Sequence, residues 1–220
     1  PDNALVRWWY TARTDHRDAV VAHAARRGLK LGIDALMRKR RPVDVPPPDA
    51  LYTALDLTPV PPAMWEGGTL LRDATAPRLV RRSDLRGALH NHTTASDGTA
   101  TVEQMRDAAH ARGLQWLHIS DHSPSAHYAG GLDVERLFAQ VEHIRSLPEH
   151  PTTLLTGVEA DILADGRLDH PPAVLERLDV VVASIHDRMR QDGAAITERL
   201  CNAAEQAHVI GHPTGRLLLG

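Results

Sequence analysis

The sequence predicts an α/β protein whose second half is a sheet or barrel covered by helices, preceded by a small mixed N-terminal segment. From residue 85 onward, apolar stretches of strand length alternate with stretches of helical periodicity. Residues 180–185 are almost wholly apolar, as expected for a strand that is buried on both faces of a parallel sheet. In addition, residues that can bind cations follow these strands one after another.

The N-terminal elements are a helix and a proline-rich stretch. Residues 16–27 are rich in good helix formers, and Gly28 is placed to end the helix. Residues 42–62 contain seven prolines, which predicts extended and turn structure with one small helix at residues 49–55. Residues 65–83 show little periodicity and are expected to form a linker.

The second half alternates strands with helices. The helix expected at residues 133–146 carries Val134, Leu137, Val141 and Ile144 on one stripe, at spacings of three and four. The expected strands are residues 86–90, 114–120, 153–158, 180–185 and 209–210, and the expected helices are residues 101–112, 133–146, 171–177 and 194–206.

The composition excludes several classes of protein. No apolar run approaches the roughly 20 residues that span a bilayer, so we expect no membrane span. Residues 1–10 lack the basic, apolar and small-residue regions of a secretory signal. The single cysteine, Cys201, excludes an internal disulfide framework and fits the reducing cytosol, so we expect a cytoplasmic protein.

The charge is divided unequally along the chain. The net charge is −3, but residues 1–86 hold 15 Lys and Arg against 10 Asp and Glu, whereas residues 87–220 hold 10 against 18. The first part includes the basic run Arg38-Lys39-Arg40-Arg41. This asymmetry predicts a polyanion as the partner of the first part and cations as partners of the second. Ordinary surface variation is the alternative explanation for the basic part.

Side chains that can bind metals gather at the ends of the predicted strands. In α/β barrels the carboxyl ends of the strands meet on one face, so these side chains are expected to converge. Each one alone has an ordinary alternative, such as a hydrogen-bonded surface histidine or a solvent-exposed glutamate. Together they indicate divalent cations, because carboxylates gathered in one pocket repel each other unless cations are present. The residues are His90 and His92 after the first strand, Asp97 on the next loop, His122 after the second strand, Glu159 after the third, His186 after the fourth and His212 after the fifth.

The kind of ligand narrows the metal and the chemistry. Residues two apart in an extended segment point to the same side, so His90 and His92 are expected to grip one cation together. Nitrogen and oxygen ligands without cysteine suit zinc, manganese or iron, and the choice among them stays open. Two or three neighbouring ions give a direct route to hydrolysis of phosphate esters.

These residues lie in motifs that resemble those of the polymerase and histidinol phosphatase (PHP) domain. Further motifs resemble bacterial family X DNA polymerases, which carry this domain at their C-terminus. Residues 10–31 are similar to the last part of the polymerase module of that family. The PHP motifs are His90-Asn91-His92, Ser96-Asp97-Gly98, Ser120-Asp121-His122-Ser123, Gly157-Val158-Glu159, Ala183-Ser184-Ile185-His186 and Gly211-His212-Pro213, and the family X motifs are His122-Ser123-Pro124-Ser125, Asp161-Ile162-Leu163 with Asp165-Gly166, and residues 212–218.

The resemblance implies a distorted barrel of seven βα units with up to three divalent ions. The implied ligand sets are His90, His92 and Glu159 for one ion, Glu159, His186 and His212 for a second, and Asp97 and His122 for a third. The implied catalytic core is His90, His92, Glu159 and His186. Asp121 is expected to orient its neighbour His122. Arg216 is expected to face a substrate phosphate, with a structural salt bridge as the alternative.

The chain departs from that family at both ends. The family supplies its last two ligands from an Asp-x-His motif, and this chain stops at Gly220 before such a motif. We therefore expect a barrel that is incomplete at the C-terminus, with an open sheet edge, in a chain that is a piece of a longer protein. Residues 1–82 show no recognisable polymerase carboxylates, so the chain should not polymerise DNA. The expected domains are a remnant of the polymerase module with a proline-rich linker at 1–82 and a partial PHP domain at 83–220.

Three functions are compatible with this sequence. The leading hypothesis is a metal-dependent phosphoesterase that acts on DNA ends, as a 3′→5′ exonuclease or a 3′-phosphatase in DNA repair, with the basic N-terminal part binding DNA. One alternative is a phosphatase for small esters of the histidinol phosphate type. The other is a non-catalytic, metal-binding module that stabilises a polymerase.

Overall fold

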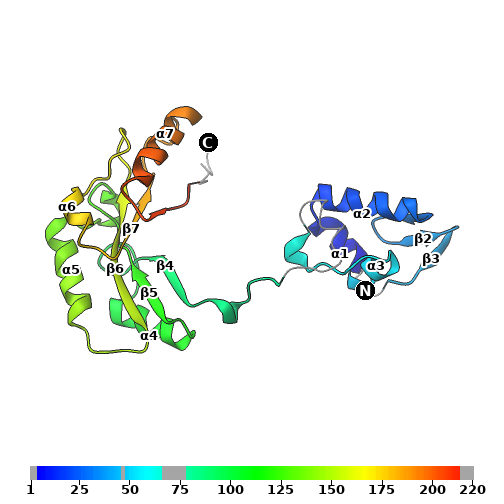
Figure 1. Cartoon of the computed structure of the whole chain (residues 1–220), viewed down its shortest axis with the longest axis horizontal. Coiled ribbons are helices and arrows are strands. Elements are labelled where there is room, and N and C mark those ends of the chain that lie inside the picture. The colour runs from blue at the N-terminus through cyan, green and yellow to red at the C-terminus, as the bar shows by residue number, and fades with distance from the viewer. Residues whose placement is uncertain (1–3, 46–47, 66–77, 214–220) are drawn as a thin grey trace. The chain divides into compact units, whose positions relative to one another are not determined.

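The computed structural model describes residues 4–45, 48–65 and 78–213 (Figure 1). The chain divides into two compact units, Pro1–Leu79 and Val80–Gly220. Within the described ranges, every helix is too short or too polar to cross a lipid bilayer. Arg216 and most of the linker expected at residues 65–83 lie outside the described residues.

The N-terminal unit combines three helices with a small antiparallel sheet. The helix predicted at residues 16–27 is α2, and Gly28 follows it with a φ of +70°, the left-handed conformation that often ends a helix. The sheet has the order β1-β2-β3 and was absent from the sequence prediction, because strands of three residues are too short to show a clear alternation. The elements are α1 (Ala4–Thr11), α2 (Thr14–Arg26), β1 (Leu29–Leu31), β2 (Leu36–Arg38), β3 (Arg41–Val43), α3 (Pro48–Ala54) and the 3₁₀ turn η1 (Pro62–Met64).

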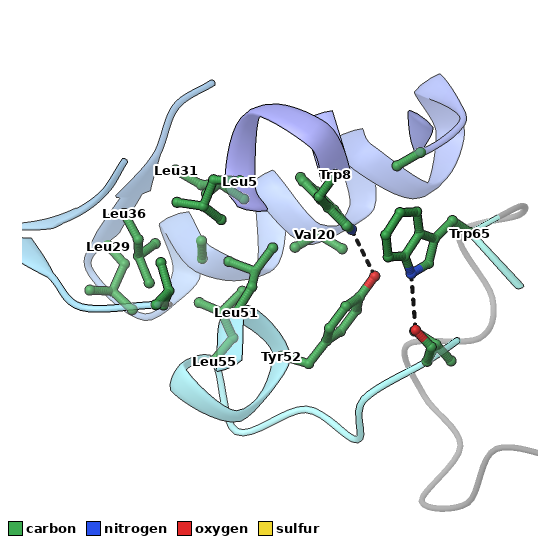
Figure 2. Close-up of a cluster of buried hydrophobic side chains, with 14 of the residues drawn as sticks. Leu5, Trp8, Val20, Leu29, Leu31, Leu36, Leu51, Tyr52, Leu55 and Trp65 are labelled. Carbon is green, nitrogen blue, oxygen red and sulfur yellow. Dashed lines mark hydrogen bonds between the residues drawn. The ribbon is translucent and has the colours of Figure 1, made fainter. Parts of the chain in front are cut away.

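Trp8 and Tyr52 lie at the centre of this unit and are fully buried (Figure 2). The indole N–H of Trp8 donates to the hydroxyl oxygen of Tyr52 at 2.9 Å, and Nε2 of His16 lies 2.8 Å from the same oxygen. Val20 and Leu51 belong to the same apolar cluster. The polar atoms of the large side chains are therefore satisfied inside an apolar core that belongs to this unit alone.

The C-terminal unit is built on a five-stranded parallel sheet with the order β4-β5-β6-β7-β8. The sheet curls like part of a barrel, which confirms the predicted α/β class. The elements are η3 (Arg82–Asp84), β4 (Gly87–Asn91), α4 (Val102–Ala111), β5 (Trp116–Ile119), η4 (His127–Ala129), α5 (Val134–Ser146), β6 (Thr153–Asp161), α6 (Pro172–Leu175), β7 (Val180–Ser184), α7 (Gly193–Ala204) and β8 (Val209–Ile210).

Capping residues set the boundaries of the predicted helices. At the start of α4, the Thr101 hydroxyl accepts the N–H of Gln104 at 3.3 Å, and the Gln104 side chain accepts the N–H of Thr101 at 3.0 Å. Gly113 follows this helix with a φ of +77°. At the start of α5, the Asp133 carboxylate accepts the N–H of Arg136 at 2.9 Å. These local signals explain why the helices were predictable.

The central strand β6 is longer than the sequence predicts. We expected the strand to end at residue 158 with Glu159 following it, but β6 pairs with β7 as far as Asp161, which lies opposite Ser184. Glu159 therefore lies inside the strand, between the fully buried Val158 and Ala160, and is itself only 1% exposed. A carboxylate at such a position requires partners that compensate for its loss of water.

Candidate metal centre

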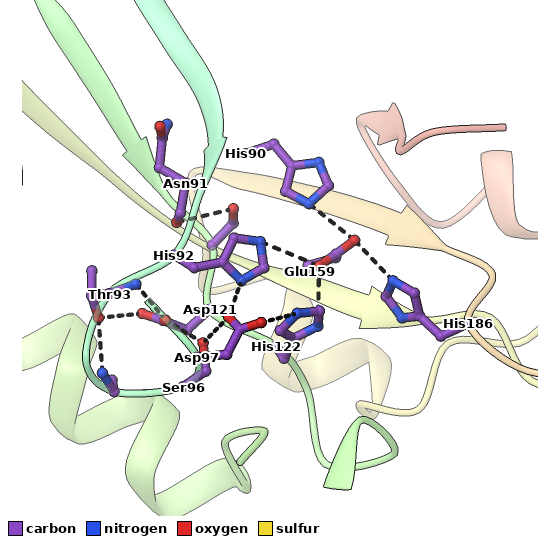
Figure 3. Close-up of polar contacts among 12 residues, drawn as sticks. His90, Asn91, His92, Thr93, Ser96, Asp97, Asp121, His122, Glu159 and His186 are labelled. Atoms are coloured by element: carbon purple, nitrogen blue, oxygen red, sulfur yellow. Dashed lines mark hydrogen bonds and ion pairs between the residues drawn. The ribbon is translucent and has the colours of Figure 1, made fainter. Parts of the chain in front are cut away.

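Five imidazole rings surround the carboxylate of Glu159, and Figure 3 shows four of them. They come from β4, from the loops that follow β4, β5 and β7, and from the residues after β8, so the fold brings together side chains that are far apart in the chain. The distances from Glu159 Oε1 are 2.9 Å to His90 Nε2, 3.0 Å to His212 Nε2 and 3.3 Å to His186 Nε2, and those from Oε2 are 3.1 Å to His122 Nδ1 and 3.4 Å to His92 Nε2.

Asp97 supplies a second carboxylate on the side of His92 and His122. Its oxygens lie 3.2 Å from His92 Nδ1 and 3.5 Å from His122 Nε2, so each of these two rings stands between two carboxylates. A neutral imidazole has one N–H and one lone pair, so it cannot donate to both sides. The Nδ1 atoms of His92 and His122 are buried. Each lies near a carboxylate oxygen, but neither forms a hydrogen bond among the described residues. Cations between the rings and the carboxylates would use these lone pairs, so the residues fit divalent metal ions.

The seven residues predicted as metal ligands all lie in this cluster. Three groups of them place their ligand atoms within 4.8 Å of one another. The grouping differs from the one that the resemblance implies, because His212 lies with His90 and because His92 lies with Asp97 and His122. The groups are His90, Glu159 and His212; His92, Asp97 and His122; and His122, Glu159 and His186.

The alternation of an extended strand does not explain how His90 and His92 come to face Glu159. His90 has a φ of +60°, and the pairing of β4 with β5 shifts register between Ala88 and Asn91. The two rings nevertheless lie 5.3 Å apart between their centroids. The prediction that the alternation of an extended segment puts both rings on one side is therefore wrong. The backbone turns at His90, which adopts a left-handed conformation that is rare outside glycine.

The electrostatics of the cluster favour bound cations. Burial raises the pKa of Glu159, but hydrogen bonds from His186 and His90 outweigh it and hold that pKa well below its ordinary value. Burial and the neighbouring His122 lower the pKa of His92, against the opposing effect of Glu159 and Asp97. A carboxylate that stays ionised beside His92, an imidazole that resists protonation, is a suitable neighbour for a cation.

Asp161 is a member of the site, although the sequence analysis named it only within a motif and gave it no role. Its carboxylate contacts Nδ1 of His186, whose Nε2 faces Glu159. Burial lowers the pKa of His186, but its hydrogen bonds with Asp161 and Glu159 outweigh burial and raise that pKa to about 10. Asp161 follows Glu159 by two positions on β6, so strand alternation would have identified it only if the strand had been predicted to reach residue 161.

Asp121 holds a loop of the site in place. We predicted that it orients His122, but its carboxylate accepts hydrogen bonds from the N–H and hydroxyl of Thr93, both at 2.7 Å, and from the Ser96 hydroxyl at 2.5 Å (Figure 3). It also accepts one from the Gln140 amide at 2.6 Å. Asp121 is 1% exposed. Its contacts therefore fix the loop that carries Asp97, which changes the role expected for it.

Tyr128 lies at the open edge of the cluster. Its ring centroid is 6.0 Å from that of His122 and 6.3 Å from that of His186, yet the residue is 73% exposed. Burial of its hydroxyl and the nearby carboxylates raise the pKa of Tyr128, so the hydroxyl keeps its proton. A groove of about 620 Å³ lies beside it, lined among others by His186, Arg167 and Arg188.

Residues 88–212 match the family described as PHP domain. The chain belongs to the PHP domain family. The match extends from β4 to the residue after β8 that completes the histidine cluster, so the PHP domain contains all seven predicted ligands.

Three relatives are similar to this PHP chain over part of its length. The Bacillus subtilis protein named DNA polymerase/3′-5′ exonuclease PolX is 38% identical over 172 residues, which cover 76% of this chain and 30% of the relative. A probable phosphatase of Caldanaerobacter subterraneus is 34% identical over 137 residues, which cover 56% of this chain and 50% of the relative. A probable phosphatase of Acetivibrio thermocellus is 35% identical over 132 residues, which cover 56% and 52%. The chain thus spans about a third of PolX and about half of these phosphatases.

Proposed function

We propose that this PHP domain is a metal-dependent phosphoesterase that hydrolyses phosphate esters at DNA ends, as a 3′→5′ exonuclease or a 3′-phosphatase. The observation that carries the proposal is the position of Glu159, a carboxylate that is 1% exposed and has imidazole nitrogens within 3.4 Å of both its oxygens. Such a carboxylate can bridge two cations, because it belongs to two of the three groups that could hold one.

Divalent ions bound there would supply Lewis acidity, which activates water and neutralises the charge of a phosphate ester. The residues of the chain would prepare the site for them. Asp161, in contact with Nδ1 of His186, would hold the proton on that nitrogen, so that Nε2, which faces Glu159, is the atom left to exchange its proton for an ion. Asp121 would keep the loop with Asp97 in place. The ion beside His186 would depend on Asp161, and the ion beside Asp97 would depend on Asp121.

DNA ends are the proposed substrate for two reasons. The match with PolX covers 76% of this chain and 30% of PolX, and PolX bears the name of a 3′-5′ exonuclease. Tyr128 presents an exposed ring beside His122 and His186, and an aromatic ring at this position can stack on a nucleobase of a frayed end. The basic N-terminal unit would add binding energy through the phosphates.

The organisation of the longer protein follows from the same proposal. Residues 83–220 would be part of a distorted barrel of seven βα units, and residues 1–82 the last part of a polymerase module with its linker. Arg216 would face a substrate phosphate. Zinc, manganese and iron remain the candidate ions, with up to three bound at once.

A phosphatase for small esters is the second candidate, because the relatives from Caldanaerobacter and Acetivibrio are named probable phosphatases. An assay can separate the two. The substrates are a 5′-labelled single-stranded oligonucleotide with a 3′-hydroxyl, the same strand with a 3′-phosphate, and histidinol phosphate, each with manganese, zinc or iron. We expect shortening or dephosphorylation of the strands, and its loss with EDTA and in Glu159→Gln but not in the surface variant Glu103→Gln.

Each outcome of this assay has a consequence. Faster hydrolysis of histidinol phosphate than of either strand would replace the DNA substrate with a small ester. Stoichiometric metal binding without hydrolysis of any of the three esters would instead assign the domain to a non-catalytic, metal-binding role.

A further inference from the structure

The hairpin β2–β3 of the N-terminal unit ends in four consecutive cations, Arg38, Lys39, Arg40 and Arg41, which together form the basic hairpin tip. Arg38 pairs with Arg41 across the two strands, and Lys39 and Arg40 form the two-residue connection between them. All four residues are exposed. The fold therefore concentrates four positive charges at one end of a small sheet.

The backbone of the connection is unusual for its residues. Lys39 has a φ of +49° and Arg40 a φ of +67°. Two-residue hairpin turns with positive φ at both positions strongly favour Asn-Gly, Asp-Gly or Gly-Gly, because long side chains are disfavoured in the left-handed region. Lys-Arg at this turn thus lowers the stability of the hairpin, which indicates that the two charges serve a purpose other than folding.

The four cations have no partner within the described part of the N-terminal unit. Other exposed cations of the unit are paired, such as Arg27 with Asp56 and Arg13 with Asp15. The members of the basic hairpin tip form no ion pair or side-chain hydrogen bond there. Lys39 and Arg40 also line a groove of about 750 Å³ together with Lys30, where Asp34 is the acidic residue among the lining side chains.

We propose that the basic hairpin tip docks on the phosphate backbone of duplex DNA, with a strand of phosphates following the groove beside Lys30. Arginine and lysine bind phosphates through charge-assisted hydrogen bonds, and the arginine fork can engage two phosphate oxygens at once. A two-stranded ribbon is narrow enough to approach a groove of the duplex. This surface lies outside the PHP domain. The inference rests on the DNA binding that the proposed function gives to the N-terminal unit and names the residues that carry it, and it does not depend on metal or on hydrolysis.

Duplex DNA binding by the whole chain tests this proposal. The probe is a fluorescent duplex oligonucleotide in EDTA, so that binding is measured by anisotropy without hydrolysis. In the double variant Lys39→Asn with Arg40→Gly, the slope of log Kd against log salt should become shallower by about 2, because each lost phosphate contact removes about one unit. The same variant should melt at a higher temperature than the wild-type chain, because Asn-Gly fits the turn. A more stable protein that binds DNA more weakly cannot be explained by misfolding.

Two control variants sharpen the result. Lys39→Arg with Arg40→Lys keeps both charges and should keep the wild-type slope. Arg13→Gln with Arg27→Gln removes two cations that are already paired with acids and should change the slope by less than half as much. An unchanged slope in the Asn-Gly variant would overturn the proposal. So would weaker binding of that variant to vesicles of anionic phospholipid with unchanged binding to DNA. Neither result depends on whether the PHP domain hydrolyses DNA.

Discussion

His90 donates its backbone N–H to the buried ring of His118, with 3.3 Å between His90 N and His118 Nδ1. The other ring nitrogen, Nε2, lies 3.2 Å from the carbonyl oxygen of Val180, which can only accept. The proton of the ring is therefore on Nε2, and the lone pair of Nδ1 faces His90. Burial lowers the pKa of His118 to about 4, so the ring stays neutral. This bond holds the left-handed turn that aims the His90 ring at Glu159.

Loss of the His118 acceptor should weaken metal binding without unfolding the domain. In His118→Leu, the His90 N–H loses its partner, and we expect the affinity for the ion held by His90 to fall by about 10- to 100-fold. His118→Asn keeps an acceptor at the position of Nδ1 and should retain more of the affinity. Titration with manganese or zinc, followed by calorimetry, measures both. Equal losses in the two variants would contradict a role for the hydrogen bond.

Gly157 leaves the space that the His118 ring occupies. A Cβ at position 157 would lie 1.9 Å from His118 Nε2 and 2.3 Å from the Val180 carbonyl oxygen. We expect Gly157→Ala to lower the free energy of unfolding by about 1–3 kcal/mol, as overpacking of a core does. Gly193→Ala is the matched control, because a Cβ there meets no atom within 4 Å, and it should stay within about 0.5 kcal/mol of wild type. Urea denaturation compares the two variants, and similar stabilities would refute the packing argument.

Glu159 and Asp97 should control different ions. Glu159 belongs to two of the three groups that could hold a cation, whereas Asp97 belongs to the third. Replacing Glu159 with Ala should therefore remove two ions together, and replacing Asp97 with Ala should remove one. Mass spectrometry of the bound metals after reconstitution and desalting gives the stoichiometry. If Glu159→Ala kept the wild-type stoichiometry, the bridging role of this carboxylate would be wrong.

His170 should make the fold sensitive to mild acid. The residue is 2% exposed, and burial lowers its pKa despite the opposing effect of Asp169 and of a bond with the Leu132 backbone. Below a pH of about 6.5 the unfolded chain takes up a proton at His170 that the folded chain excludes, so stability falls as the pH falls, by up to about 1.4 kcal/mol per pH unit. Urea denaturation between pH 7 and pH 5, as set by that reference pKa, should give a shallower pH dependence for His170→Gln than for wild type. Parallel curves for the two proteins would exclude this residue as the cause.

The C-terminal unit was predictable because its signals are local. Thr101 and Gln104 form a capping box that is visible in the sequence, and Leu137, Val141 and Ile144 form a buried stripe on α5. The end of β6 was not predictable, because its last residues are held by pairing with β7, which depends on a partner far away in the chain. The sheet of the N-terminal unit was not predicted for a different reason. Its strands are too short to show an alternation of apolar and polar residues.

The candidate site was predictable where topology alone brings residues together. Because the strands are parallel, His122, Glu159 and His186 meet at the edge of the sheet where the carboxyl ends of the strands lie, regardless of the conformation of their side chains. The residues that fix those side chains were not predictable from the sequence. His118 looks like an ordinary member of an apolar strand until the turn at His90 places an N–H against it. Asp161 became significant only when β6 proved to extend beyond Glu159.

The arrangement around Glu159 has a consequence for the order in which this domain matures. Its histidines are contributed by the chain from β4 to beyond β8, so the set is complete only when β8 has joined the sheet. A nascent or partly assembled chain would offer a cation an incomplete set of donors and release it easily. Tight retention of metal would then report correct assembly, and misfolded molecules in a preparation could be counted by the metal they lack.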